Sequence, residues 1–139
     1  KFLKRCFVGK LLSAVSLLFI VIPLMIAQEN AKPQISVKPK KSVVYYYDTM
    51  RFVRESIKVL NTGGTPMTIH EVRSSCGCAT AAVGRAIIHP TSLGHIYFNI
   101  DVSRLTDSVM RVDYYIYSNA QDSVLSYPVY LHKKQTQKH

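Results

Sequence analysis

The sequence has 139 residues, of which 47% are hydrophobic and 19% are charged, and its formal net charge at pH 7 is +10. A chain of this length and composition can bury one core, so a single globular domain is expected. The basic residues gather in no predicted basic helix and on no predicted basic-aromatic strand face, which argues against a nucleic-acid partner.

Residues 1–27 have the layout of a secretory signal peptide. An apolar run extends from Leu11 to Ala27. It is preceded by four basic residues, Lys1, Lys4, Arg5 and Lys10. We expect cleavage after Ala27. Because Met25 occupies a position that prefers a small residue, an uncleaved N-terminal membrane anchor is the alternative, and membrane contact is expected only through this segment. Without residues 1–27 the chain keeps 18 − 4 = 14 basic and eight acidic residues, a net charge of +6. Because residues 1–27 resemble an export signal, the protein is predicted to be secreted or periplasmic.

Residues 28–41 are polar and contain Pro33 and Pro39, which predicts a linker. Ile35 and Val37 form a short alternating patch within it, so the linker is expected to lead into a first edge strand. The domain itself is predicted over residues 42–132, and residues 133–139 are predicted to be a polar tail.

The domain is predicted to consist of short β-strands, because no stretch carries an apolar stripe with a 3.6-residue period. In residues 51–60, for example, Val53, Ile57 and Val59 alternate with polar residues, as in a strand with one buried and one wet face. The predicted strands cover residues 42–47, 51–60, 67–72, 86–88, 94–101, 110–118 and 124–132. Pro128 has no N–H to donate, so the last strand is predicted to be an edge strand or to bulge there.

About seven such strands, separated by turn signals at a spacing of roughly 8 to 12 residues, predict an all-β fold. The specific expectation is an immunoglobulin-like antiparallel β-sandwich. The cysteine pair that joins the two sheets of antibody domains is missing, so the core must hold without a bridge between its sheets.

Several local motifs occur in order along these strands. They are Asn61-Thr62-Gly63, Ser75-Cys76-Gly77-Cys78, Ile88-His89-Pro90 and Ser118-Asn119. This order resembles the DUF1573 family of exported immunoglobulin-like domains common in Bacteroidetes-type bacteria, and the resemblance covers approximately residues 53–131. It implies a β-sandwich in an extracytoplasmic location, and the family's biochemical role is undefined.

Two positions depart from the family pattern. Ala79 stands where the family usually has Thr, next to the cysteines, and Thr91 stands where the Gly of a Pro-Gly turn is expected. The second departure suggests a different turn at residues 90–91.

The only chemistry-bearing motif is the Cys76-Gly77-Cys78 run. In an extended segment residues i and i+2 point to the same face, with their Cα atoms roughly 6.5 Å apart, which makes a disulfide feasible but strained. Four interpretations stay open: two small side chains packed in the core, a local disulfide formed in an oxidising compartment, a soft-metal site, or thiol-disulfide exchange. Metal ligands for the third would be Cys76 and Cys78 with help from His70, Met67 or His95.

Other motifs for catalysis are missing from the sequence, which contains no H-E-x-x-H, no G-x-S-x-G and no phosphate-cradling glycine loop. No catalytic residue and no cofactor are therefore predicted. Exposed tyrosines could supply a binding surface for a protein or glycan, because tyrosine combines contact area with a polar tip. They come from the set Tyr45, Tyr46, Tyr47, Tyr97, Tyr115, Tyr117 and Tyr130, among which Tyr97, Tyr115 and Tyr117 are predicted to form the binding face. The alternative, which the sequence favours, is that half of these tyrosines pack against neighbouring strands.

These observations predict a non-catalytic binding or structural module of the cell envelope. Its partner is expected to be an envelope protein or glycan, reached through an edge strand or the tyrosine-bearing face. The alternative is a thiol-based redox or soft-metal-handling protein that uses Cys76 and Cys78.

Overall fold

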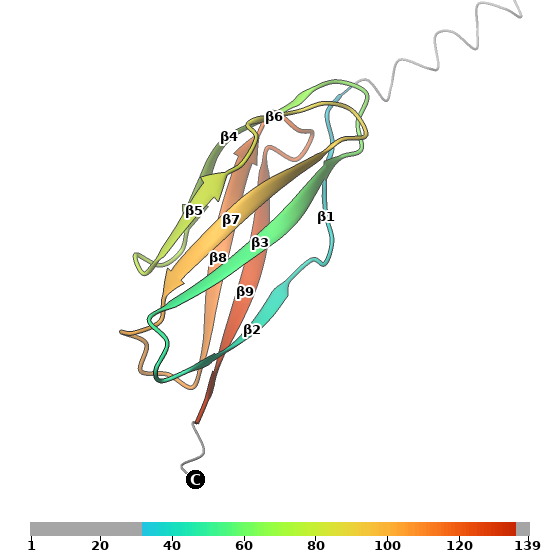
Figure 1. The fold of residues 1–139 in the computed structure, drawn as a ribbon. Coiled ribbons are helices and arrows are strands. Elements are labelled where there is room, and N and C mark those ends of the chain that lie inside the picture. The colour runs from blue at the N-terminus through green and yellow to red at the C-terminus, as the bar shows by residue number, and fades with distance from the viewer. Residues whose placement is uncertain (1–31, 136–139) are drawn as a thin grey trace, which may run out of the picture. The chain divides into compact units, whose positions relative to one another are not determined.

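The computed structural model describes residues 32–135, which form two β-sheets packed face to face (Figure 1). The four-stranded sheet has the order β1 (Ile35–Val37), β3 (Phe52–Asn61), β7 (Leu93–Asp101) and β5 (Ala79–Val83). The five-stranded sheet has the order β2 (Ser42–Tyr47), β9 (Val124–Lys134), β8 (Val109–Ser118), β4 (Met67–Ser74) and β6 (Ile87–Ile88). The predicted all-β immunoglobulin-like sandwich is confirmed.

The structure differs from the predicted strands in three respects. The predicted linker contains the edge strand β1, which pairs with β3, and residues 79–83 form the unpredicted strand β5 at the opposite edge. The sequence of β5, Ala-Thr-Ala-Ala-Val, has few strong β-formers, so its pairing with β7 decides its conformation. One pair, β2 with β9, is parallel.

The core lies between the sheets and follows from the alternation of the strands. Buried side chains of the four-stranded sheet include Val59, Ile96 and Phe98, and those of the five-stranded sheet include Val112 and Leu131. Each fully buried side chain of this kind contributes about 1.5–3 kcal/mol through removal of apolar surface from water. The intervening residues of each strand point to the outside of the sandwich.

Pro128 lies in a strand that is interior for half of its length. β9 pairs with β8 from Val124 to His132 without a register shift, while β2 pairs with β9 only from Val129 onward. The last strand is therefore an edge only at Val124–Pro128, which accommodates the missing N–H, and it has no bulge against β8. The bulge of this sheet lies instead in β4, between Ile69 and Glu71.

Asn61, the first residue of the Asn-Thr-Gly motif, is completely buried and fully hydrogen-bonded. Its Nδ2 donates to the carbonyl oxygens of Thr65 (2.8 Å) and Ile88 (3.0 Å), and its Oδ1 accepts from the backbone N–H groups of Gly63 (3.0 Å) and Gln34 (3.3 Å). At Gly63 a Cβ atom would stand 2.1 Å from the carbonyl oxygen of Lys32, so the close approach requires glycine. The motif thus joins the chain before β1 to a turn and to β6.

Thr91 has a φ angle of 60°, in the left-handed region that glycine adopts most easily. Its N–H donates to the carbonyl oxygen of Asn61 (2.9 Å). The sequence predicted a different turn at residues 90–91, because Thr91 replaces the usual glycine. This prediction is wrong, since Thr91 adopts the left-handed backbone conformation that glycine would adopt at this position.

The predicted signal peptide or anchor at residues 1–27 lies outside the described residues. Within residues 32–135 there is no helix with the length and hydrophobicity needed to cross a membrane.

Candidate functional site

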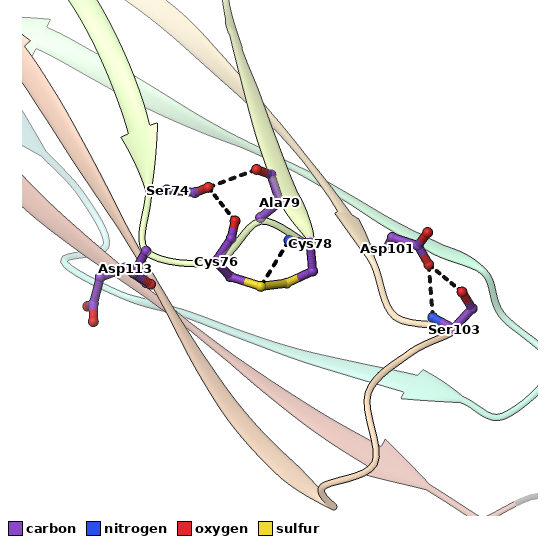
Figure 2. Close-up of a disulfide and its surroundings, with 8 residues drawn as sticks. Ser74, Cys76, Cys78, Ala79, Asp101, Ser103 and Asp113 are labelled. Carbon is purple, nitrogen blue, oxygen red and sulfur yellow. Dashed lines mark hydrogen bonds between the residues drawn. A yellow bond between two sulfur atoms is a disulfide. The ribbon is translucent and has the colours of Figure 1, made fainter.

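Cys76 and Cys78 are joined by a disulfide in the loop between β4 and β5, with their Cα atoms 5.1 Å apart (Figure 2). Ser74 Oγ lies 2.7 Å from the carbonyl oxygens of both Cys76 and Ala79, so its single proton can be donated to either. The backbone N–H of Cys78 donates to Sγ of Cys76 at 3.0 Å. The bridge and these hydrogen bonds fold the loop into a tight turn.

Hydrogen bonds fix this loop to both sheets. The N–H of Asp101 in β7 donates to the carbonyl oxygen of Cys78 (2.8 Å), and the N–H of Ser75 donates to the carbonyl oxygen of Asp113 in β8 (2.8 Å). The N–H of Asp113 returns a bond to Ser75 Oγ (3.0 Å). The Ser-Cys-Gly-Cys motif therefore marks the point where the chain crosses from the five-stranded to the four-stranded sheet.

The two cysteines are partly buried and pack against the core, whereas Gly77 is exposed. Cys78 and Gly77 line a surface hollow of about 360 Å³ on the outer face of the four-stranded sheet. Other residues of this hollow are Phe52, Thr80, Asn99, Asp101 and Arg104. The structure thus combines two of the four interpretations of the cysteine pair, a local disulfide and partial core packing.

The Asp101 carboxylate is turned toward Ser103 in Figure 2. Its Oδ1 accepts hydrogen bonds from Ser103 Oγ (2.5 Å) and from the Ser103 N–H (3.0 Å). These bonds are the main reason that the pKa of Asp101 is lowered, and the nearby charges of Arg51 and Arg104 lower it further. Asp101 is therefore a carboxylate at neutral pH, with two cations beside it.

The metal-site alternative receives no ligand set from residues 32–135, where no three His, Cys, Asp or Glu side chains are grouped to hold an ion. Both sulfur atoms are used in the bridge. His70 is the exposed residue at the β4 bulge, Met67 is buried at the start of β4, and His95 lies in β7 beside Tyr97.

The predicted binding face is divided by the structure. Tyr97 lies in β7 and points outward from the four-stranded sheet, whereas Tyr115 and Tyr117 lie in β8 and point outward from the five-stranded sheet. Tyr97 is 52% exposed and Tyr115 is 37% exposed. Because the two sheets turn their outer faces away from each other, Tyr97 cannot share one planar contact surface with the other two.

The outer side of the five-stranded sheet carries a larger aromatic surface, which we call the tyrosine face. It consists of Tyr45, Tyr115, Tyr117 and Tyr130, contributed by β2, β8 and β9. Of the other predicted tyrosines, Tyr46 is buried and Tyr47 is exposed at the end of β2. Tyr45 is 55% exposed and is the most open of the four.

Cations lie over the rings of the tyrosine face. Lys134 Nζ is 4.5 Å from the ring centroid of Tyr45, and the Arg73 guanidinium carbon is 5.5 Å from that of Tyr117. Lys41 and Arg111 both lie 5.8 Å from the centroid of Tyr130. The expectation that no basic-aromatic strand face exists is wrong, because the basic residues come from four separate segments that only the sheet brings together.

Three carboxylates near this face are paired with cations. Glu71 Oε1 is 2.8 Å from Arg73 Nε, and this hydrogen bond lowers the pKa of Glu71. Asp113 Oδ1 is 2.7 Å from Arg111 Nη2, and Asp48 Oδ1 is 2.8 Å from Lys133 Nζ. Neither Lys41 nor Lys134 takes part in a salt bridge within residues 32–135.

A second hollow, of about 450 Å³, lies next to Tyr97 on the outer face of the four-stranded sheet. Thr80 and Asn99 line both this hollow and the one beside Cys78, so the two hollows are neighbours. The lining of the hollow combines small side chains of β5 and β3, such as Ala82 and Ser56, with the large ring of Tyr97. The sequence did not predict this hollow, because it did not predict β5, which forms one wall of it.

Comparison with known proteins bears on the fold. A family model described as "Protein of unknown function (DUF1573)" matches residues 44–128. A comparison with curated proteins found no match.

Solved structures resemble the domain at low sequence identity. A protein of unknown function from Porphyromonas gingivalis W83 is 17% identical with a TM-score of 0.65; the match covers 76% of this chain and 50% of that one. The seventh PapD-like domain of human CEP192 is 8% identical with a TM-score of 0.56, covering 79% and 92%. The CupB2 chaperone of Pseudomonas aeruginosa is 15% identical with a TM-score of 0.51, covering 70% and 55%. The chain spans about half the length of the P. gingivalis protein, and at these identities the shared property is the sandwich fold.

Proposed function

The chain belongs to the DUF1573 family, and from this premise we propose that it is a non-catalytic, extracytoplasmic binding module of the bacterial cell envelope. Its partner is an envelope protein with an acidic surface, recognised through the tyrosine face. The observation that carries this proposal is the row of cations over the rings of Tyr45, Tyr117 and Tyr130.

The composition of the tyrosine face suits a protein partner. Tyrosine and arginine are enriched at protein interfaces, because they supply contact area together with directed hydrogen bonds. The face has both, and its rings stand on rigid strands. Ring ordering on binding therefore loses little conformational entropy.

The charge of this face supports an acidic surface on the partner. Glu71 and Asp113 are already paired with arginines of the same face, while Lys41 and Lys134 have no salt bridge within the described part of the chain. Carboxylates of a partner could approach these two lysines without displacing an existing pair. Such complementarity mainly raises the association rate and the specificity.

The edge strands β1, β5 and β6 offer less surface for recognition, whereas the edge strand β2 contributes Tyr45 to the tyrosine face. β1 has three residues and β6 has two, and short edges limit the addition of a further strand. β5 is longer, with five uncharged residues, but it presents no aromatic or charged side chain for specificity.

An extracytoplasmic location is supported by two observations. Residues 1–27 have the pattern of an export signal, and the Cys76–Cys78 bridge is a feature of oxidising compartments. In the same compartment a nucleic-acid partner for the basic face is not expected.

The test is cross-linking of the tagged full-length chain in envelope preparations, followed by identification of captured proteins. We expect a captured protein that is lost from the Tyr115→Ser, Tyr117→Ser double variant and retained by the Tyr97→Ser variant on the opposite sheet. Equal capture by both variants would overturn the proposal. So would a bound species that survives proteinase treatment and is released by glycan digestion.

A further inference from the structure

The Cys76–Cys78 bridge is poorly suited to stabilise the fold. It encloses only three residues, and the stabilisation from a cross-link falls as the enclosed loop becomes shorter. Hydrogen bonds of the backbone hold the same loop independently: the Ala79 N–H donates to the carbonyl oxygen of Cys76 (3.2 Å) and the Asp101 N–H to that of Cys78 (2.8 Å). The sulfur–sulfur bond can therefore open while the loop stays anchored between the two sheets.

The two cysteines differ in their surroundings. Cys78 is among the residues that line the hollow of about 360 Å³ next to β5, and Cys76 is not. At Gly77 an added Cβ atom would have no neighbouring atom within 4 Å, so the approach over the loop is open. Attack of a thiolate needs a path to one sulfur of the bridge. Of the two cysteines, only Cys78 lines the hollow, so the approach is expected on its side.

The charges beside the hollow favour an anionic nucleophile. Arg104 lines the hollow, and both Arg51 and Arg104 act on the Asp101 carboxylate. These three groups have a net charge of 2 − 1 = +1. Because the Asp101 carboxylate is turned toward Ser103, its negative charge is engaged by hydrogen bonds away from the bridge (Figure 2).

Cys76 is the sulfur that is prepared to leave. Its Sγ accepts a hydrogen bond from the Cys78 N–H at 3.0 Å. A hydrogen bond to the charged form of a group favours that form, and a thiol of lower pKa leaves faster in exchange reactions. The backbone of the loop thus supplies a donor for the thiolate that bond cleavage would create.

We propose that the Cys76–Cys78 bridge is a site of thiol-disulfide exchange that accepts two electrons from a dithiol of a protein or peptide, with Cys78 attacked and Cys76 leaving. The first thiolate of the dithiol bonds to Cys78 Sγ while the bond to Cys76 breaks, which releases the Cys76 thiolate. In the mixed disulfide, the first sulfur of the dithiol is bonded to Cys78 Sγ. The second thiolate of the dithiol then attacks that first sulfur, which breaks its bond to Cys78 and releases the Cys78 thiolate. The dithiol is oxidised to a disulfide, and its two protons and two electrons reside on Cys76 and Cys78.

This exchange site does not involve the tyrosine face, so either proposal can fail without the other. A preference of the attacking thiolate for Cys78 over Cys76 is a property that a bridge with a merely structural role would not show. Trypsin should release both cysteines in one peptide, Ser74–Arg85, since basic residues stand at positions 73 and 85.

The experiment treats the folded full-length chain, in mild detergent, with reduced glutathione and traps the products with N-ethylmaleimide. We expect glutathione on Cys78 and maleimide on Cys76, in about tenfold excess over the opposite isomer. A dithiol peptide with two cysteines should become oxidised while both cysteines of Ser74–Arg85 become labelled, in equal amounts. Equal isomers, the reverse preference, or a bridge that reacts only after denaturation would each overturn the proposal.

Charge variants test the hollow as the path of approach. Arg104→Gln should slow the attack by glutathione about two- to fivefold, and Arg104→Lys should retain most of the rate. Arg54→Gln is the matched control, because Arg54 lies on the same side of the sandwich but lines only the hollow next to Tyr97. Equal rates for the Gln variants at both positions would contradict approach through the hollow beside Cys78.

Discussion

The rings of Phe98 and Tyr114 stack across the interface of the two sheets, with centroids 3.9 Å apart and an interplanar angle of 17°. Both side chains are buried, and they join β7 of one sheet to β8 of the other. The Tyr114 hydroxyl has no hydrogen-bond partner within the described residues. Its burial raises the pKa of Tyr114, since the charged form would lose its hydration.

Removal of this hydroxyl should stabilise the domain. A buried hydroxyl without a partner is unfavourable, so we expect Tyr114→Phe to raise the free energy of unfolding by about 1 kcal/mol. Tyr127→Phe is the matched control, because the Tyr127 hydroxyl lies 2.8 Å from Ser42 Oγ and its loss should destabilise by about 1 kcal/mol. Urea unfolding of both variants measures the difference, and the same sign for both would contradict the assignment.

Thr91 is held in a backbone conformation that favours glycine. Replacement by glycine relieves about 1–2 kcal/mol of left-handed strain and loses about 0.5–1 kcal/mol through the greater freedom of the unfolded chain. Thr91→Gly should therefore raise the free energy of unfolding by about 0.5–1 kcal/mol. Thr62→Gly, at a turn residue without a positive φ angle, should show no gain; a loss of stability in Thr91→Gly would refute the expectation.

Asn61 should be among the most sensitive polar residues of the domain. Asn61→Ala leaves the buried carbonyl oxygen of Ile88 and the Gly63 N–H without their partner, and we expect a loss of about 3 kcal/mol. Asn119→Ala, which removes an exposed bond to the Thr68 N–H, should lose about 1 kcal/mol. Thermal unfolding of the two variants gives the ratio, and similar losses would show that burial does not determine the effect.

Loss of the bridge should reduce stability by less than the ~2–4 kcal/mol that is typical of a disulfide. For an enclosed loop of three residues the chain-entropy relation gives about 1.6 kcal/mol at 25 °C. The Cys76→Ala, Cys78→Ala double variant should therefore remain folded, with a lower midpoint in urea. An unfolded variant would show that the bridge is essential to the fold and would weaken the case for reversible exchange.

Asp101 should titrate below the usual range of an aspartate. Its pKa is lowered mainly by the hydrogen bonds from Ser103, so the associated stability is present above the unfolded-state pKa and is lost as the pH falls through the folded-state pKa. Ser103→Ala should move the pKa of Asp101 upward in an NMR titration. An unchanged pKa would assign the effect to Arg51 and Arg104 instead.

The alternation of apolar and polar residues was enough to predict most strands and the sandwich class. Strands such as β3 and β8 bury one face, and a period of two residues places the same side chains inward in any correct sandwich. β5 was missed because its small residues carry little β propensity of their own. The parallel pair of β2 and β9 is a contact between distant segments that local pattern does not encode.

The sequence by itself determined the fold class, the motif order that marks the family and the pairing potential of Cys76 and Cys78. Only the tertiary structure decided which side of the sandwich each outward residue occupies. Alternation distinguishes inside from outside within one strand, but a sandwich has two outer faces, and the assignment of strands to sheets selects between them. For this reason Tyr97 is separated from Tyr115 and Tyr117, and cations from distant segments meet over one set of rings.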